Sequence, residues 1–114
     1  MNAVQRPRLS IVVLNRQRER FVAHAIESAC AQTLEREQPG AVEVIVVDDG
    51  STDGTAQMLA QHGTRVRVLS QPNGGLARAR ATGVAAARGQ WIALLDADDL
   101  CRPERLALQA RVLE

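Results

Sequence analysis

The stretch Trp91-Ile92-Ala93-Leu94-Leu95-Asp96-Ala97-Asp98-Asp99 indicates the fold: an apolar run of strand length that ends in three carboxylates within four positions. Two carboxylates about 5 Å apart repel each other by roughly 3 kcal/mol at an effective dielectric constant of about 20. Two explanations are open at this point. The acids could cap a following helix, for which Asp is favoured, or they could bind a hard divalent cation.

Three other apolar runs precede this one, and each of the four is followed by a helical pattern. Continuous rather than alternating apolar runs are typical of parallel strands covered on both faces. The strands are predicted at 9–14, 42–47, 66–69 and 90–95, and the helices at 18–33, 55–61, 76–88 and from 103 or 104 to the end. The charged segment 34–40, which ends in Pro39-Gly40, is predicted as a turn. The repeated strand–helix order predicts an α/β fold: a Rossmann-like open, mostly parallel sheet of about four strands with helices on both faces.

Unusual polar residues follow each predicted strand. In an open parallel sheet, ligands bind at the carboxyl ends of the strands. The sequence therefore predicts one ligand site at that edge, built from Leu14-Asn15-Arg16-Gln17, Asp48-Asp49-Gly50-Ser51, Asn73-Gly74-Gly75 and Asp96-Ala97-Asp98-Asp99.

Composition excludes several classes of function. The 114 residues are 46% hydrophobic and 24% charged, which is typical of one globular domain or a piece of one. A net charge of +1 gives no reason to expect a nucleic-acid partner. All 14 basic residues are Arg, so no lysine can act as a base. No apolar run approaches the ~20 residues of a membrane span, and no signal peptide is evident, so the cytoplasm is expected. Cys30 and Cys101 lack CxxC spacing and are expected to be reduced.

Individual motifs exclude other ligands. A calcium loop beginning at Asp49 would need Glu at its twelfth position, where the chain has Ala60. The turn Asn73-Gly74-Gly75 lacks both the G-x-G-x-x-G spacing and the lysine of a P-loop. A phospho-accepting receiver domain also needs a lysine, and a nucleotidyltransferase needs a glycine-rich loop after the first strand.

Taken together, the motifs resemble a known family. The segments that carry the resemblance are 10–13, 26–28, 31–33, 44–53, 73–80, 87–89, 95–99 and 103–106. In this order and spacing they resemble the inverting, GT-A-fold glycosyltransferases of family 2. The resemblance implies that residues 1–114 are the nucleotide-sugar-binding half of such a domain. It also implies that the acceptor half and the catalytic general base lie beyond Glu114, so this chain alone is not expected to complete the reaction.

The resemblance also implies roles for individual residues. The donor would be a nucleotide-diphosphate sugar, with a UDP-sugar favoured, and the acceptor an unknown hydroxyl. Asp98 and Asp96 would hold Mn²⁺ or Mg²⁺, which leaves Asp99 free to cap the next helix. The expected nucleotide-binding residues are Leu14, Arg16, Asp48, Asp49, Gly75, Arg80, Asp96 and Ala97.

The first strand departs from the family pattern. Where the family has a Pro-x-Tyr-Asn type of sequence, this chain has Leu14-Asn15-Arg16-Gln17, so Arg16 replaces the usual aromatic neighbour of the base. Its planar guanidinium could stack on a base instead. The departure also keeps open a non-catalytic nucleotide-binding or regulatory module. An exposed sheet edge further predicts self-association as a homodimer.

Overall fold

The computed structural model, which describes residues 6–62 and 65–113, contains one four-stranded sheet. Its strands are β1 (Leu9–Asn15), β2 (Val42–Asp49), β3 (Arg67–Gln71) and β4 (Trp91–Asp96). They lie in the order β3-β2-β1-β4, and every neighbouring pair is parallel. The predicted α/β class and the number of strands are therefore confirmed.

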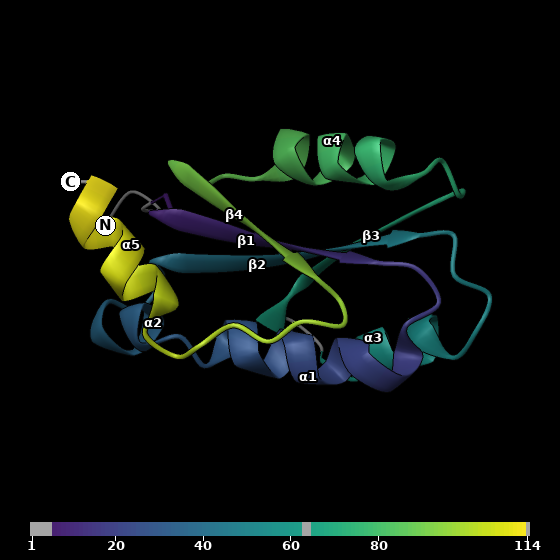
Figure 1. The fold of residues 1–114 in the computed structure, drawn as a ribbon, viewed down its shortest axis with the longest axis horizontal. Coiled ribbons are helices and arrows are strands. Elements are labelled where there is room, and N and C mark those ends of the chain that lie inside the picture. Colours follow the sequence, from purple (N-terminus) through teal and green to yellow (C-terminus); the bar gives the residue numbers. More distant parts are fainter. Residues whose placement is uncertain (1–5, 63–64, 114) are drawn as a thin grey trace, which may run out of the picture.

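Helices cover both faces of this sheet. They are α1 (Glu19–Cys30), α2 (Thr33–Glu37), α3 (Thr55–Ala60), α4 (Leu76–Ala86) and α5 (Arg105–Leu113). Figure 1 shows α4 on one face, with α1 and α3 on the other and α2 and α5 at one end. The chain crosses from the β3 edge to the opposite β4 edge through α4, which packs on β1 and β2.

The central strand β1 serves two hydrophobic cores because its successive side chains point to opposite faces. Ile11 and Val13 belong to the core on the α1 side, while Val12 and Leu14 belong to the core under α4. Burying an aliphatic side chain of this size contributes about 1.5–3 kcal/mol. Gly83 lets α4 approach closely, since a Cβ there would lie 2.3 Å from Val12 Cγ1. The central strand is therefore packed tightly on the α4 side.

The segment between α1 and β2 differs from its prediction. The first helix ends at Cys30 rather than Thr33, and α2 forms where a turn was expected. Leu34 is buried, and the Glu35 carboxylate accepts hydrogen bonds from the N–H groups of Gly40 and Val42, each at 2.9 Å. These contacts stabilise a helical turn that the local sequence does not indicate.

The short helix α3 packs on the core through Thr55 and Leu59, which are buried, whereas Ala56 and Ala60 are exposed. The Asp53 carboxylate accepts a hydrogen bond from Thr55 N–H at 3.1 Å. This bond gives a partner to one of the N–H groups that the first turn of a helix leaves free.

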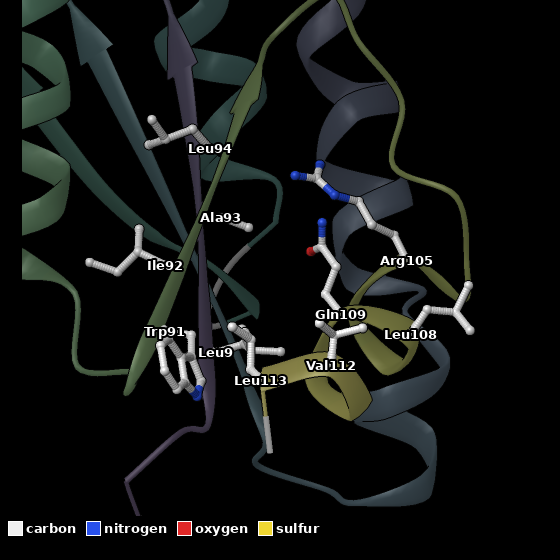
Figure 2. A pocket seen from close by; sticks show the side chains of 10 residues that line it. All are labelled: Leu9, Trp91, Ile92, Ala93, Leu94, Arg105, Leu108, Gln109, Val112 and Leu113. Atoms are coloured by element: carbon white, nitrogen blue, oxygen red, sulfur yellow. The ribbon is translucent and has the colours of Figure 1, made fainter.

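A wide apolar groove of about 720 Å³ lies between the edge strand β4 and α5 (Figure 2). Helix α5 begins at Arg105, slightly later than predicted, and no described segment packs beyond β4. Consequently several large apolar side chains are exposed here, namely Trp91, Ile92, Leu94, Leu108, Val112 and Leu113. None of the helices in the described part of the chain has the length and apolar character needed to span a bilayer.

Candidate functional site

The carboxyl ends of β1, β2 and β4 bring together polar segments that are distant in the sequence. In the strand register, Asn15 lies beside Asp48 and Leu14 lies beside Asp96. The order of the strands reverses at β1, since β2 and β3 lie on one side of it and β4 on the other. Ligands of open α/β sheets bind at such a position.

A cavity of about 210 Å³ opens between the ends of β1 and β2 and the beginning of α4. Four of the predicted nucleotide-binding residues are among those that line it, which are Leu14, Asn15, Arg16, Asp49, Asn73, Gly75, Leu76 and Ala79. Its wall includes buried apolar side chains, and its polar groups include one acid and one arginine. A few polar groups among apolar ones is the usual composition of a small-molecule site.

Asp49, the acid that lines this cavity, accepts three hydrogen bonds. Its Oδ1 accepts hydrogen bonds from Gln71 Nε2 (3.0 Å) and Gly74 N–H (2.9 Å), and its Oδ2 accepts one from Gly75 N–H (3.0 Å). The bond from Gln71, then those from the two glycines and the nearby charge of Arg16, hold the pKa of the Asp49 carboxyl below its ordinary value. A carboxylate has about four lone-pair positions. One acceptor position, on Oδ2, therefore stays available to a ligand.

Asp48 joins the ends of β1 and β2. Its Oδ1 accepts hydrogen bonds from Asn15 Nδ2 (3.2 Å) and Ser51 Oγ (2.5 Å), and Asn15 Nδ2 also lies 3.3 Å from Ser51 Oγ. Both Asp48 and Asn15 are buried. Asp48 thus supports the loop after β2, and its contact with a nucleotide stays a prediction.

Gln17 is the last residue of the segment 14–17, which departs from the family pattern, and its backbone conformation is unusual. Its φ of 56° lies in the left-handed region, which non-glycine residues rarely adopt. Hydrogen bonds compensate for this: Gln17 N–H donates to Ser51 Oγ (2.9 Å), Nε2 donates to Thr52 Oγ1 (2.9 Å), and Oε1 accepts from Thr52 N–H and Asp53 N–H. The altered sequence therefore still fastens the end of β1 to the loop after β2.

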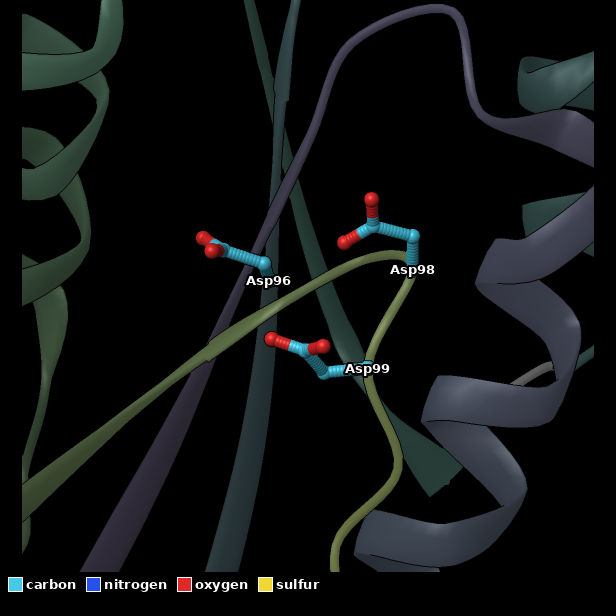
Figure 3. Close-up of side chains that lie close together, drawn as sticks. All are labelled: Asp96, Asp98 and Asp99. Atoms are coloured by element: carbon cyan, nitrogen blue, oxygen red, sulfur yellow. The ribbon is translucent and has the colours of Figure 1, made fainter.

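The acids that follow β4 form an open turn. Asp96, Asp98 and Asp99 are exposed, and each offers one carboxylate oxygen within 4.8 Å of the others (Figure 3). The Nε of Arg18 lies 3.9 Å from Asp98 Oδ2, with about half of each side chain exposed. Ala97 is buried, and its N–H donates to Leu14 O (3.0 Å), which ties the turn to β1.

The idea that these acids cap the next helix is wrong. Helix α5 begins only at Arg105, and Asp99 instead donates its backbone N–H to Asp96 O at 2.9 Å. The acids therefore belong to the turn and not to α5, which removes the first of the two explanations offered by the sequence.

The structure does not place every predicted residue at the cavity. Arg80 is exposed on α4 and is not among the cavity-lining residues, so its contact with a nucleotide stays a prediction. Two contributors were missed by sequence reasoning, namely Gln71, which binds Asp49, and Arg18, which faces Asp98. The position of Gln71 at the end of β3, on the same edge, was the signal that could have identified it.

Comparison with known proteins identifies the family. The family model described as Glycosyl transferase family 2 matches residues 10–114. The chain belongs to glycosyl transferase family 2. It is 43% identical over 102 residues to the succinoglycan biosynthesis protein ExoO of Rhizobium meliloti, covering 88% of the chain and 28% of that protein. It is 36% identical over 105 residues to the chondroitin synthase of Escherichia coli, covering 90% of the chain and 15% of that enzyme.

Solved structures of similar proteins confirm the GT-A fold predicted for this member of family 2. S. aureus TarS 1–349 in complex with UDP matches with a TM-score of 0.80 and 25% identity, over 92% of the chain and 31% of that structure. The mannosyltransferase PcManGT from Pyrobaculum calidifontis, in complex with GDP-Man and Mn²⁺, matches with a TM-score of 0.70 and 27% identity, over 95% of the chain and 32% of that structure. The chain spans about a quarter of the length of relatives such as ExoO.

Proposed function

We propose that this chain is the donor-binding part of an enzyme that transfers a sugar, with inversion, from a nucleotide-diphosphate sugar to a hydroxyl acceptor. The observation that carries the proposal is the adjacency of the small cavity and the acidic turn. Leu14 lines the cavity, and its neighbour in the sheet is Asp96, the first acid of the turn. A base in the cavity would therefore direct its diphosphate towards the acids.

The acidic turn fits a divalent cation. Two oxygens bound to the same Mg²⁺ lie about 3.0 Å apart when adjacent and about 4.2 Å apart when opposite, given bond lengths of about 2.1 Å. The three carboxylate oxygens lie within 4.8 Å of one another, so small side-chain rotations would bring them into this range. All-oxygen ligands suit Mg²⁺ or Mn²⁺, and the similar PcManGT was solved with Mn²⁺. We assign Asp98 and Asp96 as its ligands. A cation there would neutralise charge on the departing diphosphate.

The free acceptor on Asp49 favours uracil as the base. Uracil presents one imide N–H between two carbonyl groups, which matches the single available position on Asp49 Oδ2. Guanine presents two adjacent donors on that edge, but Oδ1 already accepts two hydrogen bonds. Cytosine has a lone pair in place of the imide N–H and would face the carboxylate unfavourably. Arg16 lines the same cavity and could donate to a uracil carbonyl.

A titration of the chain with UDP, CDP and GDP in the presence of Mn²⁺ tests both parts of the proposal. We expect UDP to bind most tightly, with CDP weakened by about tenfold through the lost hydrogen bond. Binding of all three with equal affinity would contradict the role of Asp49. Absence of binding by all three would contradict the donor site and with it the transferase.

Catalysis needs groups outside these residues. The described residues contain no acid that both faces the cavity and lacks a role in binding, so we assign no general base to this part of the chain. We expect no sugar transfer by the 114-residue chain alone, because it spans only about a quarter of the relatives it matches. A non-catalytic nucleotide-binding module stays the alternative, and the cytoplasmic location stays a prediction.

We also propose that two copies of the chain associate through β4. This edge strand exposes Trp91, Ile92 and Leu94, each by about two-fifths. Antiparallel pairing of two β4 strands would place Asp96, at one end, near Arg88, which precedes the other end. Light scattering at high concentration should give the mass of a dimer, and Leu94→Asp should restore the monomer. A monomeric mass for the unmodified chain would contradict this proposal.

A further inference from the structure

A buried glutamine connects α1 to the segment that follows the acidic turn. Gln32, which is fully buried, follows α1. Its Nε2 donates to Arg102 O (2.7 Å) and lies 3.1 Å from Cys101 Sγ, while its Oε1 accepts from Leu106 N–H (3.0 Å) in the first turn of α5. The two ends of one amide therefore hold both the end of the acidic segment and the beginning of α5.

Two neighbouring contacts reinforce this connection. Cys101 N–H donates to Ser28 Oγ (2.9 Å), and Thr33 N–H donates to Pro103 O (2.8 Å). Ser28 Oγ in turn donates to Ala25 O (2.8 Å), so it is itself fixed by α1. The backbone of residues 101–106 is thus bound at several points to one rigid helix end.

The acidic turn lies between this anchor and a second one. Its other end is tied to β1 by the hydrogen bond from Ala97 N–H to Leu14 O. Between the anchors, the side chains of Asp98 and Asp99 are exposed and contact solvent rather than a core. Their positions therefore depend on where the two anchors hold the backbone.

We propose that Gln32 is a positioning residue that holds Asp98 where it can bind a divalent cation together with Asp96. The inference rests on the proposed function, since it concerns the same cation. Gln32 is suited to this role because both polar groups of its amide bond to the backbone: Nε2 to Arg102 O and Oε1 to Leu106 N–H. These two bonds fix the position and the orientation of the segment relative to α1. An apolar side chain of the same size would fill the space but would leave Arg102 O and Leu106 N–H without their partners.

The test compares Gln32→Met with Val22→Ala in the 114-residue chain. Val22 is a fully buried residue of α1 in the main core, and its side chain makes no hydrogen bond, so its truncation destabilises the fold but leaves the hydrogen bonds of Gln32 in place. Mn²⁺ affinity is measured by electron paramagnetic resonance, and uridine affinity by calorimetry without metal. Gln32→Met should weaken Mn²⁺ binding by about tenfold, as is typical for residues that orient metal ligands. Uridine binding should be unchanged, because the cavity lies on the other side of β1.

The outcomes separate the inference from the proposed function. An unchanged Mn²⁺ affinity in Gln32→Met, or an equal loss in Val22→Ala, overturns the positioning role alone. Failure of the unmodified chain to bind Mn²⁺ overturns the metal site and the inference with it. If Gln32→Met does not fold, Ser28→Ala removes the contact with Cys101 N–H, together with the local bond to Ala25 O, and the same selective but smaller loss of Mn²⁺ affinity is expected. An unchanged Mn²⁺ affinity in Ser28→Ala would then overturn the inference.

Discussion

The two halves of the site use the same residue type in opposite ways. At the cavity, Asp48 and Asp49 are buried and already accept hydrogen bonds from side chains and backbone. At the turn, Asp96, Asp98 and Asp99 are exposed, and among residues 6–62 and 65–113 their one ion pair is the 3.9 Å contact of Asp98 with Arg18. The first pair is held in place without a ligand and keeps one acceptor position on Asp49, whereas the second group concentrates negative charge that no other described residue neutralises fully.

This difference assigns a separate task to each half. A carboxylate held by several donors presents one remaining acceptor in a fixed direction, which is what recognition of a base requires. Exposed carboxylates that repel one another instead bind a cation and can adjust to it. The cavity should therefore recognise its ligand without metal, and the turn should contribute only when a cation is present.

The largest expected effect comes from removing a ligand of the turn. Asp98→Asn should weaken Mn²⁺ binding by at least about 100-fold, more than is usual when only the partner of a metal ligand is lost. Electron paramagnetic resonance measures the free Mn²⁺ directly. The matched control is Glu104→Gln, an exposed acid a few residues away that should leave Mn²⁺ binding unchanged. Equal losses in both variants would show that only overall charge matters.

A substitution in the cavity should weaken the binding of uridine but not the binding of Mn²⁺. Asp49→Asn removes the free acceptor and disturbs the bonds from Gly74 and Gly75, so uridine affinity should fall by about tenfold. Mn²⁺ affinity should not change, and Asp98→Asn serves as the reciprocal control. Calorimetry with uridine checks the first point. A parallel loss of uridine and Mn²⁺ binding in either variant would break the distinction between the two halves.

A smaller effect is expected from the cation beside the turn. Arg18→Gln removes the positive charge near Asp98, so Mn²⁺ should bind more tightly, by up to about fivefold given the weak coupling of exposed ion pairs. Arg20→Gln is the control, since Arg20 is an exposed residue of the same helix. Weaker Mn²⁺ binding in Arg18→Gln would instead make Arg18 part of the binding site.

The smallest effect concerns stability at acid pH. The pKa of the Asp49 carboxyl is lowered in the folded protein, chiefly by its bond from Gln71, relative to about 3.9 in the unfolded chain. The unfolded state therefore binds the proton more readily, so this contribution is present above the unfolded pKa and is lost as pH falls through the folded pKa. Urea unfolding should show that the stability difference between the unmodified chain and Asp49→Asn shrinks from neutral pH to about pH 3. A difference that does not depend on pH would contradict the role of these hydrogen bonds.

Much of this arrangement could be predicted from the sequence because it follows from periodicity. Continuous apolar runs identified the four strands, and the parallel sheet then placed the residues after each strand at one edge. That Asp49 and Gly75 would meet in one cavity followed from this topology and from the family resemblance.

What could not be predicted depends on contacts between distant segments. The helical turn α2 is stabilised by Glu35, which closes the following loop. The acids after β4 do not cap α5 because that helix begins only at Arg105, where Gln32 accepts a hydrogen bond from the first turn. Gln17 keeps the altered end of β1 in place through bonds to residues 51–53. Such partners leave no periodic signal in the sequence.

One measurement tests the division of tasks most directly, namely calorimetric titration of the chain with uridine and with UDP, each with and without Mn²⁺. Uridine should bind with the same affinity in both conditions, because hydrogen bonds within the protein already hold Asp49 in place without a metal ion. UDP should bind more tightly than uridine only when Mn²⁺ is present, because without it the diphosphate faces uncompensated carboxylates. UDP binding that is unaffected by Mn²⁺, or no binding of either ligand in any condition, would contradict the account.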